Sequence, residues 1–357
     1  MINYTLFMIS PVVVELLLAV IFGRSVNDEK KTKIIYLVIM GVILALMIGL
    51  KSVKVGSNDA VIYIDNWEKL GKLPLSKLPH ALKTIDIEEG YLITVWALSH
   101  IFRWKQFTFI FYGIFLAVSV CFFIYLNAED VCLGFVMFST LGLFAFLVQG
   151  QRQGIAIGIC LLSVELVKRR RPILFILMIL LAMSFHATAI VFFPVYFFPL
   201  FKFNILGFIV FGVVSIIALL SMDRIIELGN IVINDTYSSG KTKDSAGGIF
   251  TLLIYLLIII AALLFADREK ENLNIFFFMM ICGTICFIMR FSLNTIMQRV
   301  THYFSISSVV LASHVIMRFE KGQRLIYRYL IIILCLAFAF YKSGYSVIVP
   351  YTFFWQS

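Results

Sequence analysis

Long apolar runs separated by short polar segments make up most of the chain. A membrane-spanning helix needs about 20 apolar residues, with a lower limit near 17. On that measure the sequence predicts twelve spans, near residues 4–22, 34–51, 106–126, 131–148, 153–168, 172–186, 187–201, 204–221, 249–265, 274–290, 300–317 and 329–343. Pro194 and Pro199 interrupt the stretch from Pro172 to Phe201, which is therefore predicted to be a tight hairpin or a broken helix.

The composition points to the same class of protein. Hydrophobic residues make up 61% of the 357 residues and charged residues 14%, whereas a soluble domain is about half apolar and a quarter charged. No soluble core of this size could bury so much apolar surface. The predicted fold is an all-α, polytopic membrane helix bundle that forms one integral membrane domain over residues 1–357.

The orientation follows from four compact basic clusters in short loops. One threading places them all in the cytoplasm, provided that residues 90–103 do not cross the membrane; the clusters are Arg24 to Lys33, Lys168 to Arg171, Arg268 to Lys270 and Arg318 to Arg328. The first span is then expected to be uncleaved, with its N-terminus outside. Residues 52–106 and 222–248 become long external loops, and Tyr91–Phe102 in the first loop is expected to lie at the interface.

The charge and the cysteines exclude several functions. A net charge of +10 in a membrane protein sets the topology or meets lipid phosphates, so nucleic-acid binding is not expected. The six cysteines lie in or beside apolar runs, without the spacing of a zinc site, and are expected to be small packing residues. We expect no metal and no cofactor.

Two groups of polar residues interrupt the middle of the chain. Gln149, Arg152 and Gln153 share a face if their junction is helical, and glycines at every fourth residue from Gly150 would let another helix approach closely. A guanidinium fixed there could clamp a diphosphate, or could be a snorkelling interfacial arginine. His186 lies in a long apolar stretch. It could be a general base or a phosphate ligand, or a satisfied histidine of the core.

Two further groups lie near predicted outer ends of spans. Arg299, His302 and Tyr303 follow helical spacing and, with Arg290, could grip phosphate oxygens; an aromatic belt with an anchoring arginine is the alternative. The first external loop carries acidic residues and a tyrosine that could contact a sugar or accept a proton, or form solvated ion pairs: Asp59, Tyr63 and Glu88.

At these residues the chain resembles the EpsG-like branch of the Wzy-type polysaccharide polymerases. The matching motifs are Gly56, Asp59 and Tyr63; Glu88, Gly90 and Tyr91; Arg152, Gln153 and Ala156; Phe185, His186, Thr188 and Ala189; and the pair Arg299 and Tyr303. Two positions depart from the family pattern. Glu89 stands in place of a proline, and Lys51 or Lys54 stands in for an arginine before the first glycine.

The resemblance implies a GT-C-like fold and a multi-pass glycosyltransferase of the bacterial inner membrane, with its active site facing the periplasm. Such an enzyme joins oligosaccharide repeat units carried on undecaprenyl diphosphate into O-antigen, capsule or exopolysaccharide, without a metal. Besides membrane lipids, a flippase and a chain-length regulator are the implied partners.

The resemblance also implies roles for individual residues. The arginines would stabilise the departing diphosphate, and His186 would act on the acceptor hydroxyl with Glu88 or Asp59 behind it. The residues expected to bind the substrate or diphosphate are Arg152, Gln153, Arg290, Arg299, His302, Tyr303 and Tyr63.

Two other functions stay open at this point. A flippase for lipid-linked oligosaccharides would be expected to contain internal repeats and ionisable groups near the membrane midplane, but the sequence shows no repeat. An O-antigen ligase would use the same diphosphate donor and differ only in its acceptor.

Overall fold

The chain folds into a bundle of helices. The computed structural model describes residues 2–56, 59–202, 204–220, 247–267, 269–293, 295–344, 346 and 348–356. Within these ranges the one β-type pairing is an isolated bridge between Lys51 and Phe353. In chain order, with η for a 3-10 helix, the elements are α1 (Ile2–Phe22), α2 (Lys30–Gly49), α3 (Asp59–Leu70), η1 (Leu75–Lys77), α4 (Leu78–Thr84), α5 (Glu89–Ile101), α6 (Phe107–Asn127), α7 (Val131–Thr140), α8 (Leu143–Gln149), α9 (Gln151–Lys168), α10 (Pro172–Met183), η2 (Ala187–Leu200), α11 (Ile205–Leu220), α13 (Gly247–Phe265), α14 (Leu273–Leu293), α15 (Thr295–Phe304), α16 (Ser307–Ile316), α17 (Lys321–Ser343) and η3 (Phe354–Gln356).

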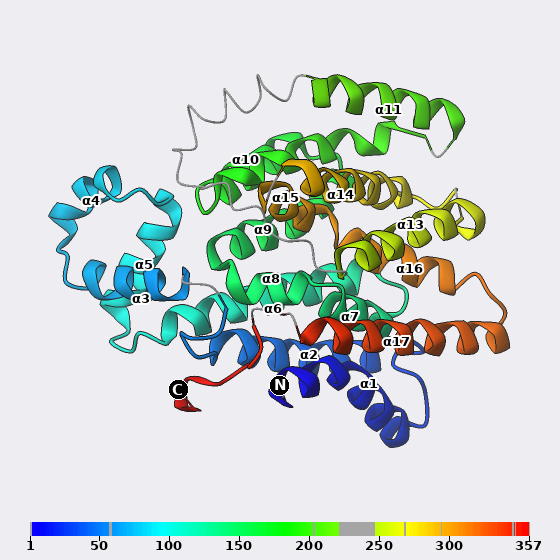
Figure 1. Ribbon diagram of the computed structural model, residues 1–357, viewed down its shortest axis with the longest axis horizontal. Helices are drawn as coiled ribbons and strands as arrows, with labels where there is room; N and C mark the ends of the chain where they lie inside the picture. The colour runs from blue at the N-terminus through cyan, green and yellow to red at the C-terminus, as the bar shows by residue number, and fades with distance from the viewer. Residues whose placement is uncertain are drawn as a thin grey trace.

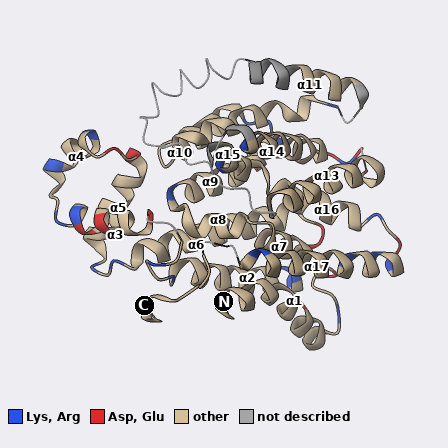
Figure 2. Ribbon diagram, viewed as in Figure 1, with Lys and Arg blue, Asp and Glu red and all other residues tan. Residues whose placement is uncertain are grey.

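The long helices lie beside one another along the longest axis of the molecule (Figure 1). Helices α3, α4 and α5 gather at one end, which we call the α3–α5 end, and the loops after α1, α6 and α9 lie at the opposite end. Figure 2 shows most of the charged residues at these two ends. The apolar middle and charged ends are what a membrane requires of a bundle that crosses it.

The prediction of a polytopic helical membrane protein is confirmed. Among the described residues, six helices are long and apolar enough to cross a membrane, or seven if α7 and α8, bent by 57°, form one broken span. Each of the twelve predicted apolar runs coincides with a helix or with a consecutive pair of helices. The runs outside the six are shorter, bent or more polar.

The stretch from Pro172 to Phe201 is two antiparallel elements. α10 ends at Met183, and η2 runs back beside it as a 14-residue 3-10 helix that contains Pro194 and Pro199. Prolines have no backbone N–H to donate, and 3-10 helices of this length are uncommon. His186 lies in the turn between α10 and η2 with extended backbone geometry, so a hairpin, one of the two predicted possibilities, is what forms.

Glycines allow α9 to pack closely against α6. A Cβ atom at Gly158 would lie 2.8 Å from the Phe115 ring, and one at Gly154 would lie 3.4 Å from a methyl group of Leu116. The close approach predicted from the glycine spacing is therefore present. It fixes the start of α9, which carries Arg152, against the bundle.

The first of the two predicted external loops is mostly helical. Residues 52–106 contain α3, η1, α4 and α5, and the segment expected at the interface is the 13-residue helix α5. Residues 222–246 of the second predicted loop lie outside the described residues, and α13 begins at Gly247.

A buried charge network joins three helices near the opposite end. Nη2 of Arg328 on α17 lies 2.6 Å from Oε1 of Glu15 on α1, and its Nε donates to Asp130. The Asp130 carboxylate also accepts a 3.0 Å hydrogen bond from the Leu133 N–H and so caps the N-terminus of α7. All three charged side chains are buried. The pairing compensates for the desolvation that each charge would otherwise suffer alone.

Candidate functional site

A cleft of about 210 Å³ opens at the α3–α5 end of the bundle. Its walls come from α3, the junction of α8 and α9, the turn before η2, and α15. The lining residues are Asp59, Tyr63, Phe146, Gln149, Gly150, Arg152, Gln153, His186, Gln298 and Arg299. The chain thus brings residues from four separate predicted groups to one place.

The break between α8 and α9 supplies the middle of the cleft. The sequence left open whether Gln149, Arg152 and Gln153 lie on one continuous helix, and they do not, because the helix is interrupted at Gly150. All three nevertheless line the cleft. The interruption lets Gln149 at the end of one helix and Arg152 in the first turn of the next point to the same space.

Glu88 joins the predicted base to the predicted diphosphate ligand. Its Oε1 lies 2.7 Å from Nδ1 of His186, and its Oε2 accepts a hydrogen bond from Nη1 of Arg152. Because an ionised carboxylate only accepts hydrogen bonds, the Nδ1 of His186 is the donor in this contact. Nε2 of His186 is buried and has no hydrogen-bond partner among the described residues. In the neutral ring, Nε2 is the nitrogen with the free lone pair, and His186 lines the cleft.

The start of α5 fixes the position of Glu88. The Gly90 N–H donates a 2.8 Å hydrogen bond to the Ser184 carbonyl at the end of α10. A Cβ atom at Gly90 would lie 2.7 Å from that same carbonyl oxygen, so a residue with a side chain would have to push the two helices apart. This contact holds Glu88 against His186, 98 positions away in the sequence.

The surroundings of Glu88 keep it ionised. Burial raises the pKa of its carboxyl. The hydrogen bond from His186 and the charge of Arg152 lower the pKa by more than burial raises it, to about 2. Glu88 is therefore a carboxylate at every pH at which a cell works. Its chemistry is to orient the imidazole and pair with the guanidinium rather than to donate a proton.

The first loop reaches the cleft through Gly56. This residue has a φ of +98°, which glycine adopts without strain, and a Cβ atom there would lie 3.0 Å from the Gln149 side chain. Asp59 and Tyr63 on the following helix line the cleft. Burial raises the pKa of Tyr63 to about 12, against the opposing charge of Arg152, so its phenol stays protonated and can donate to a substrate oxygen.

The second predicted arginine lies in the same cleft as the first. Arg299 lines the cleft with Arg152, and the Gln153 side-chain amide donates a 2.9 Å hydrogen bond to the Arg299 carbonyl, which joins α9 to α15. The two guanidinium groups and the carboxylates of Asp59 and Glu88 balance in formal charge. The cleft therefore contains two arginine side chains, and the guanidinium of Arg152 is paired with Glu88.

The other members of the predicted Arg299 group are not among the lining residues. His302 stacks on the Phe146 ring at 4.1 Å between centroids, behind the cleft wall, and the Tyr303 hydroxyl lies 3.1 Å from Oγ1 of Thr188. The Arg290 guanidinium lies over aromatic rings of its own helix. A direct role for these three in binding diphosphate stays a prediction.

Lys51, one of the two lysines predicted to stand in for a family arginine, is buried behind the site. Its ammonium donates to the Val148 carbonyl and lies 5.0 Å from the centroid of the Phe109 ring. Burial lowers its pKa to about 7, although the charge of Asp59 acts in the other direction. Lys51 is absent from the lining of the cleft, so it supports the wall rather than facing a ligand.

Sequence reasoning missed two lining residues, Gln298 and Phe146. Gln298 precedes Arg299 directly in a short segment of polar and apolar residues, and its adjacency to the arginine was a usable signal. Phe146 is one of 36 phenylalanines, and nothing in its sequence context marks it.

The described residues contain no group of three or more His, Cys, Asp or Glu side chains that could hold a metal ion.

Comparison with known proteins identifies the family. No curated protein and no solved structure matches this chain. The sequence model of the EpsG family, in contrast, matches residues 34–353, nearly the whole chain and every lining residue of the cleft. The predicted relationship is confirmed: this multi-pass membrane protein belongs to the EpsG family.

Proposed function

We propose that this protein is a polysaccharide polymerase that joins oligosaccharide repeat units carried on undecaprenyl diphosphate, at the outer face of the bacterial inner membrane. The observation that carries the proposal is that His186, Arg152 and Arg299 line one cleft and that Glu88 pairs with both His186 and Arg152. One imidazole held by a carboxylate, beside two guanidinium groups, suits transfer of a glycan from a diphosphate to a hydroxyl.

The arginines act on the donor. As the acceptor oxygen bonds to the anomeric carbon of the growing glycan, the bond from that carbon to the diphosphate oxygen breaks, and the diphosphate leaves with the bonding electrons. The charge that develops on it is stabilised by cations that are already in place. Arg152 and Arg299 come from different helices, so they can contact the leaving group from two directions.

His186 acts on the acceptor. The hydroxyl at the non-reducing end of a new repeat unit loses its proton to Nε2 of His186 as the new bond forms. Glu88 accepts the Nδ1–H of the ring and so leaves Nε2 as the basic nitrogen, and its negative charge stabilises the imidazolium that results. The product is a glycan one repeat longer, still on a lipid carrier, together with free undecaprenyl diphosphate.

The distribution of basic loops supports an outward-facing site. Short loops rich in lysine and arginine lie at the opposite end of the bundle from the cleft, among them residues 24–33, 168–171 and 318–328 (Figure 2). Such loops stay in the cytoplasm when membrane proteins insert. The cleft at the α3–α5 end would then face the periplasm, where flipped lipid-linked repeats are present.

The test is polymerisation by the purified protein with lipid-linked repeat units. Wild type is expected to produce a ladder of glycans on the lipid carrier, while Arg152→Ala and His186→Ala are expected to lose the ladder. Arg103→Ala and His80→Ala are matched controls, because both side chains are exposed and neither lines the cleft; they should polymerise normally.

Other outcomes would contradict the proposal. Full activity in both cleft variants would remove His186 and Arg152 from the reaction. Movement of repeats across a vesicle membrane without a ladder would indicate a flippase. Transfer of finished glycan from the carrier to lipid A, with no growth on the carrier, would indicate a ligase.

A further inference from the structure

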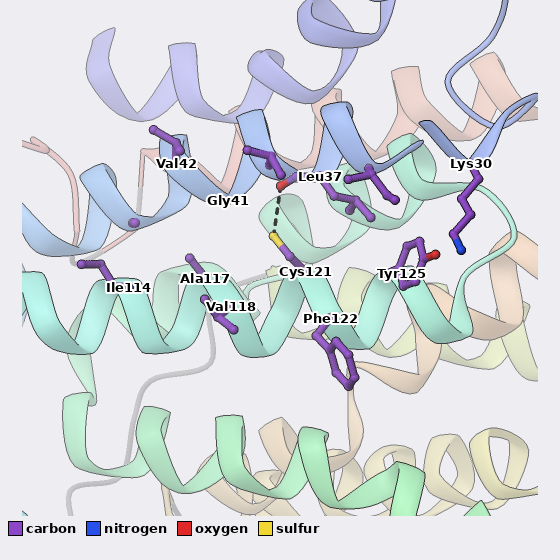
Figure 3. Close-up of a pocket in the computed structure, with 13 residues that line it drawn as sticks. Lys30, Leu37, Gly41, Val42, Ile114, Ala117, Val118, Cys121, Phe122 and Tyr125 are labelled. Atoms are coloured by element: carbon purple, nitrogen blue, oxygen red, sulfur yellow. Dashed lines mark hydrogen bonds between the residues drawn. The ribbon is translucent and has the colours of Figure 1, made fainter. Parts of the chain in front are cut away.

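A long apolar groove runs between α2 and α6, away from the cleft (Figure 3). It encloses about 670 Å³. Side chains at every fourth residue form its two walls, with Val38 and Val42 on α2 and Val118 and Phe122 on α6. Because residues four apart lie on one face of a helix, the walls are straight. We call this feature the α2–α6 groove.

The floor of the α2–α6 groove is made of small residues. Gly41 and Ala45 on α2 face Ala117 and Cys121 on α6, and a Cβ atom at Gly41 would lie only 3.1 Å from Sγ of Cys121. The Cys121 thiol donates to the Leu37 carbonyl at 3.4 Å, so even this polar group has a partner within the floor. The space above is therefore narrow, long and apolar, a shape that fits one flexible hydrocarbon chain.

The α2–α6 groove has a polar group at one end only. Lys30, the first residue of α2, lines that end next to Tyr125, in line with the α2 wall (Figure 3). Its side chain is exposed and forms no salt bridge with the residues that the structure describes. The neighbouring carboxylate of Glu29 is paired with Arg24 at 2.6 Å. An ammonium at the mouth of a hydrocarbon-shaped groove is complementary to a lipid with an anionic head group.

We propose that the α2–α6 groove binds one acyl chain of an anionic phospholipid, with the phosphate of its head group on the Lys30 ammonium. From Lys30 to Ala45 the groove follows α2 for about 22 Å at 1.5 Å per residue. That length exceeds half of a hydrocarbon core of about 30 Å, so an extended acyl chain can lie in it along its whole length.

The position of Lys30 distinguishes a phospholipid from the polyprenyl carrier of the proposed reaction. The diphosphate of the carrier would be held by arginines at the α3–α5 end, whereas Lys30 of the α2–α6 groove lies at the opposite end of the bundle. A carrier tail in this groove would place only hydrocarbon beside Lys30. The groove is thus a lipid site of its own, independent of the proposed function.

Native mass spectrometry of the full-length protein tests the proposal. The protein is titrated in detergent with phosphatidylglycerol and with phosphatidylcholine that has the same acyl chains. One phosphatidylglycerol is expected to bind in preference. Lys30→Gln should weaken its binding about fivefold, the effect of one lysine near an anionic head group, and leave phosphatidylcholine unchanged. Lys31→Gln is the matched control, because Lys31 is exposed and adjacent but does not line the groove.

A second pair of variants tests the groove itself. Val118→Trp would fill it, and because Val118 is 59% exposed the substitution should not disturb the packing of α6. This variant is expected to lose the bound phosphatidylglycerol, whereas Val13→Trp, on an exposed face of α1 outside the groove, should retain it. Three results would overturn the proposal: equal binding of the two lipids by wild type, equal effects of the two lysine variants, or retention of the lipid by Val118→Trp.

Discussion

Replacing Glu88 with glutamine tests the centre of the site with a change of one atom. In Glu88→Gln the amide keeps an oxygen for the Nδ1–H of His186, but it places an N–H₂ group against Nη1 of Arg152, so two donors face each other. Arg152 is then left partly buried without its anion. The imidazole loses the charge that stabilises its protonated form during the reaction.

The structure sets the scale of both effects. The pKa of Glu88 is about 2 in the folded protein and 4.5 in its ordinary state, which corresponds to on the order of 3 kcal/mol of stability. Because the folded value is the lower one, this stability is present above pH about 4.5 and is lost as the pH falls toward 2. Positioned proton transfer is worth ~10²- to 10⁴-fold in rate, so a loss in that range is expected.

The assay compares Glu88→Gln with Glu89→Gln in the polymerisation reaction and in thermal unfolding at pH 7. Glu89 is the adjacent, exposed carboxylate, and its variant should resemble wild type in both measurements. The part of the loss that acts through His186 is absent when the ring is absent, so the double variant Glu88→Gln/His186→Ala should lose less than the product of the two single losses. A Glu88→Gln enzyme as active as Glu89→Gln, or a double variant whose losses multiply, would refute the reasoning.

Three further changes give separate tests. Gly90→Ala should push α5 from the Ser184 carbonyl, lower activity and destabilise the protein by ~1–3 kcal/mol. The control is Gly322→Ala, whose new methyl group would meet no atom within 4 Å, and equal melting temperatures of the two variants would contradict the prediction. Arg299→Lys keeps the charge but loses the planar fork, and should slow polymerisation ~10- to 100-fold, a result that unchanged rates would exclude. Burial lowers the pKa of Lys51 to about 7, so above that pH the unfolded chain binds more protons than the folded one. Wild-type stability should therefore rise from pH 7 to 10 by up to ~1.4 kcal/mol per pH unit. Lys51→Met should abolish this slope, and parallel stability curves of the two proteins would contradict the prediction.

The sequence predicted the helices well because the membrane imposes their lengths. Any run near 20 apolar residues has few alternatives to a helix in lipid, and each predicted run became a helix or a broken pair. Breaks were harder to place. The 57° bend between α7 and α8 falls inside the predicted run 131–148, where the apolar pattern alone does not mark it.

The candidate site was predictable in its members but not in its contacts. His186 and Arg152 stand out as polar residues in apolar runs, so composition finds them. The pairing of Glu88 with both depends on α5 meeting the end of α10 at Gly90, a long-range contact that one sequence cannot reveal. Helical spacing placed Arg299 and His302 on related positions of α15, but only the packing shows that one lines the cleft and the other stacks behind it.

The carboxylate of Asp130 has a consequence for how the bundle comes apart. It accepts the N–H of Leu133, the third residue of α7, and also binds Arg328 of α17, 198 positions later. When α17 withdraws from its neighbours, the Asp130 carboxylate loses Arg328 and becomes accessible to water. Water then competes for the carboxylate, and its hydrogen bond to the Leu133 N–H weakens. Hydrogen exchange at that single amide would therefore report the detachment of a distant helix.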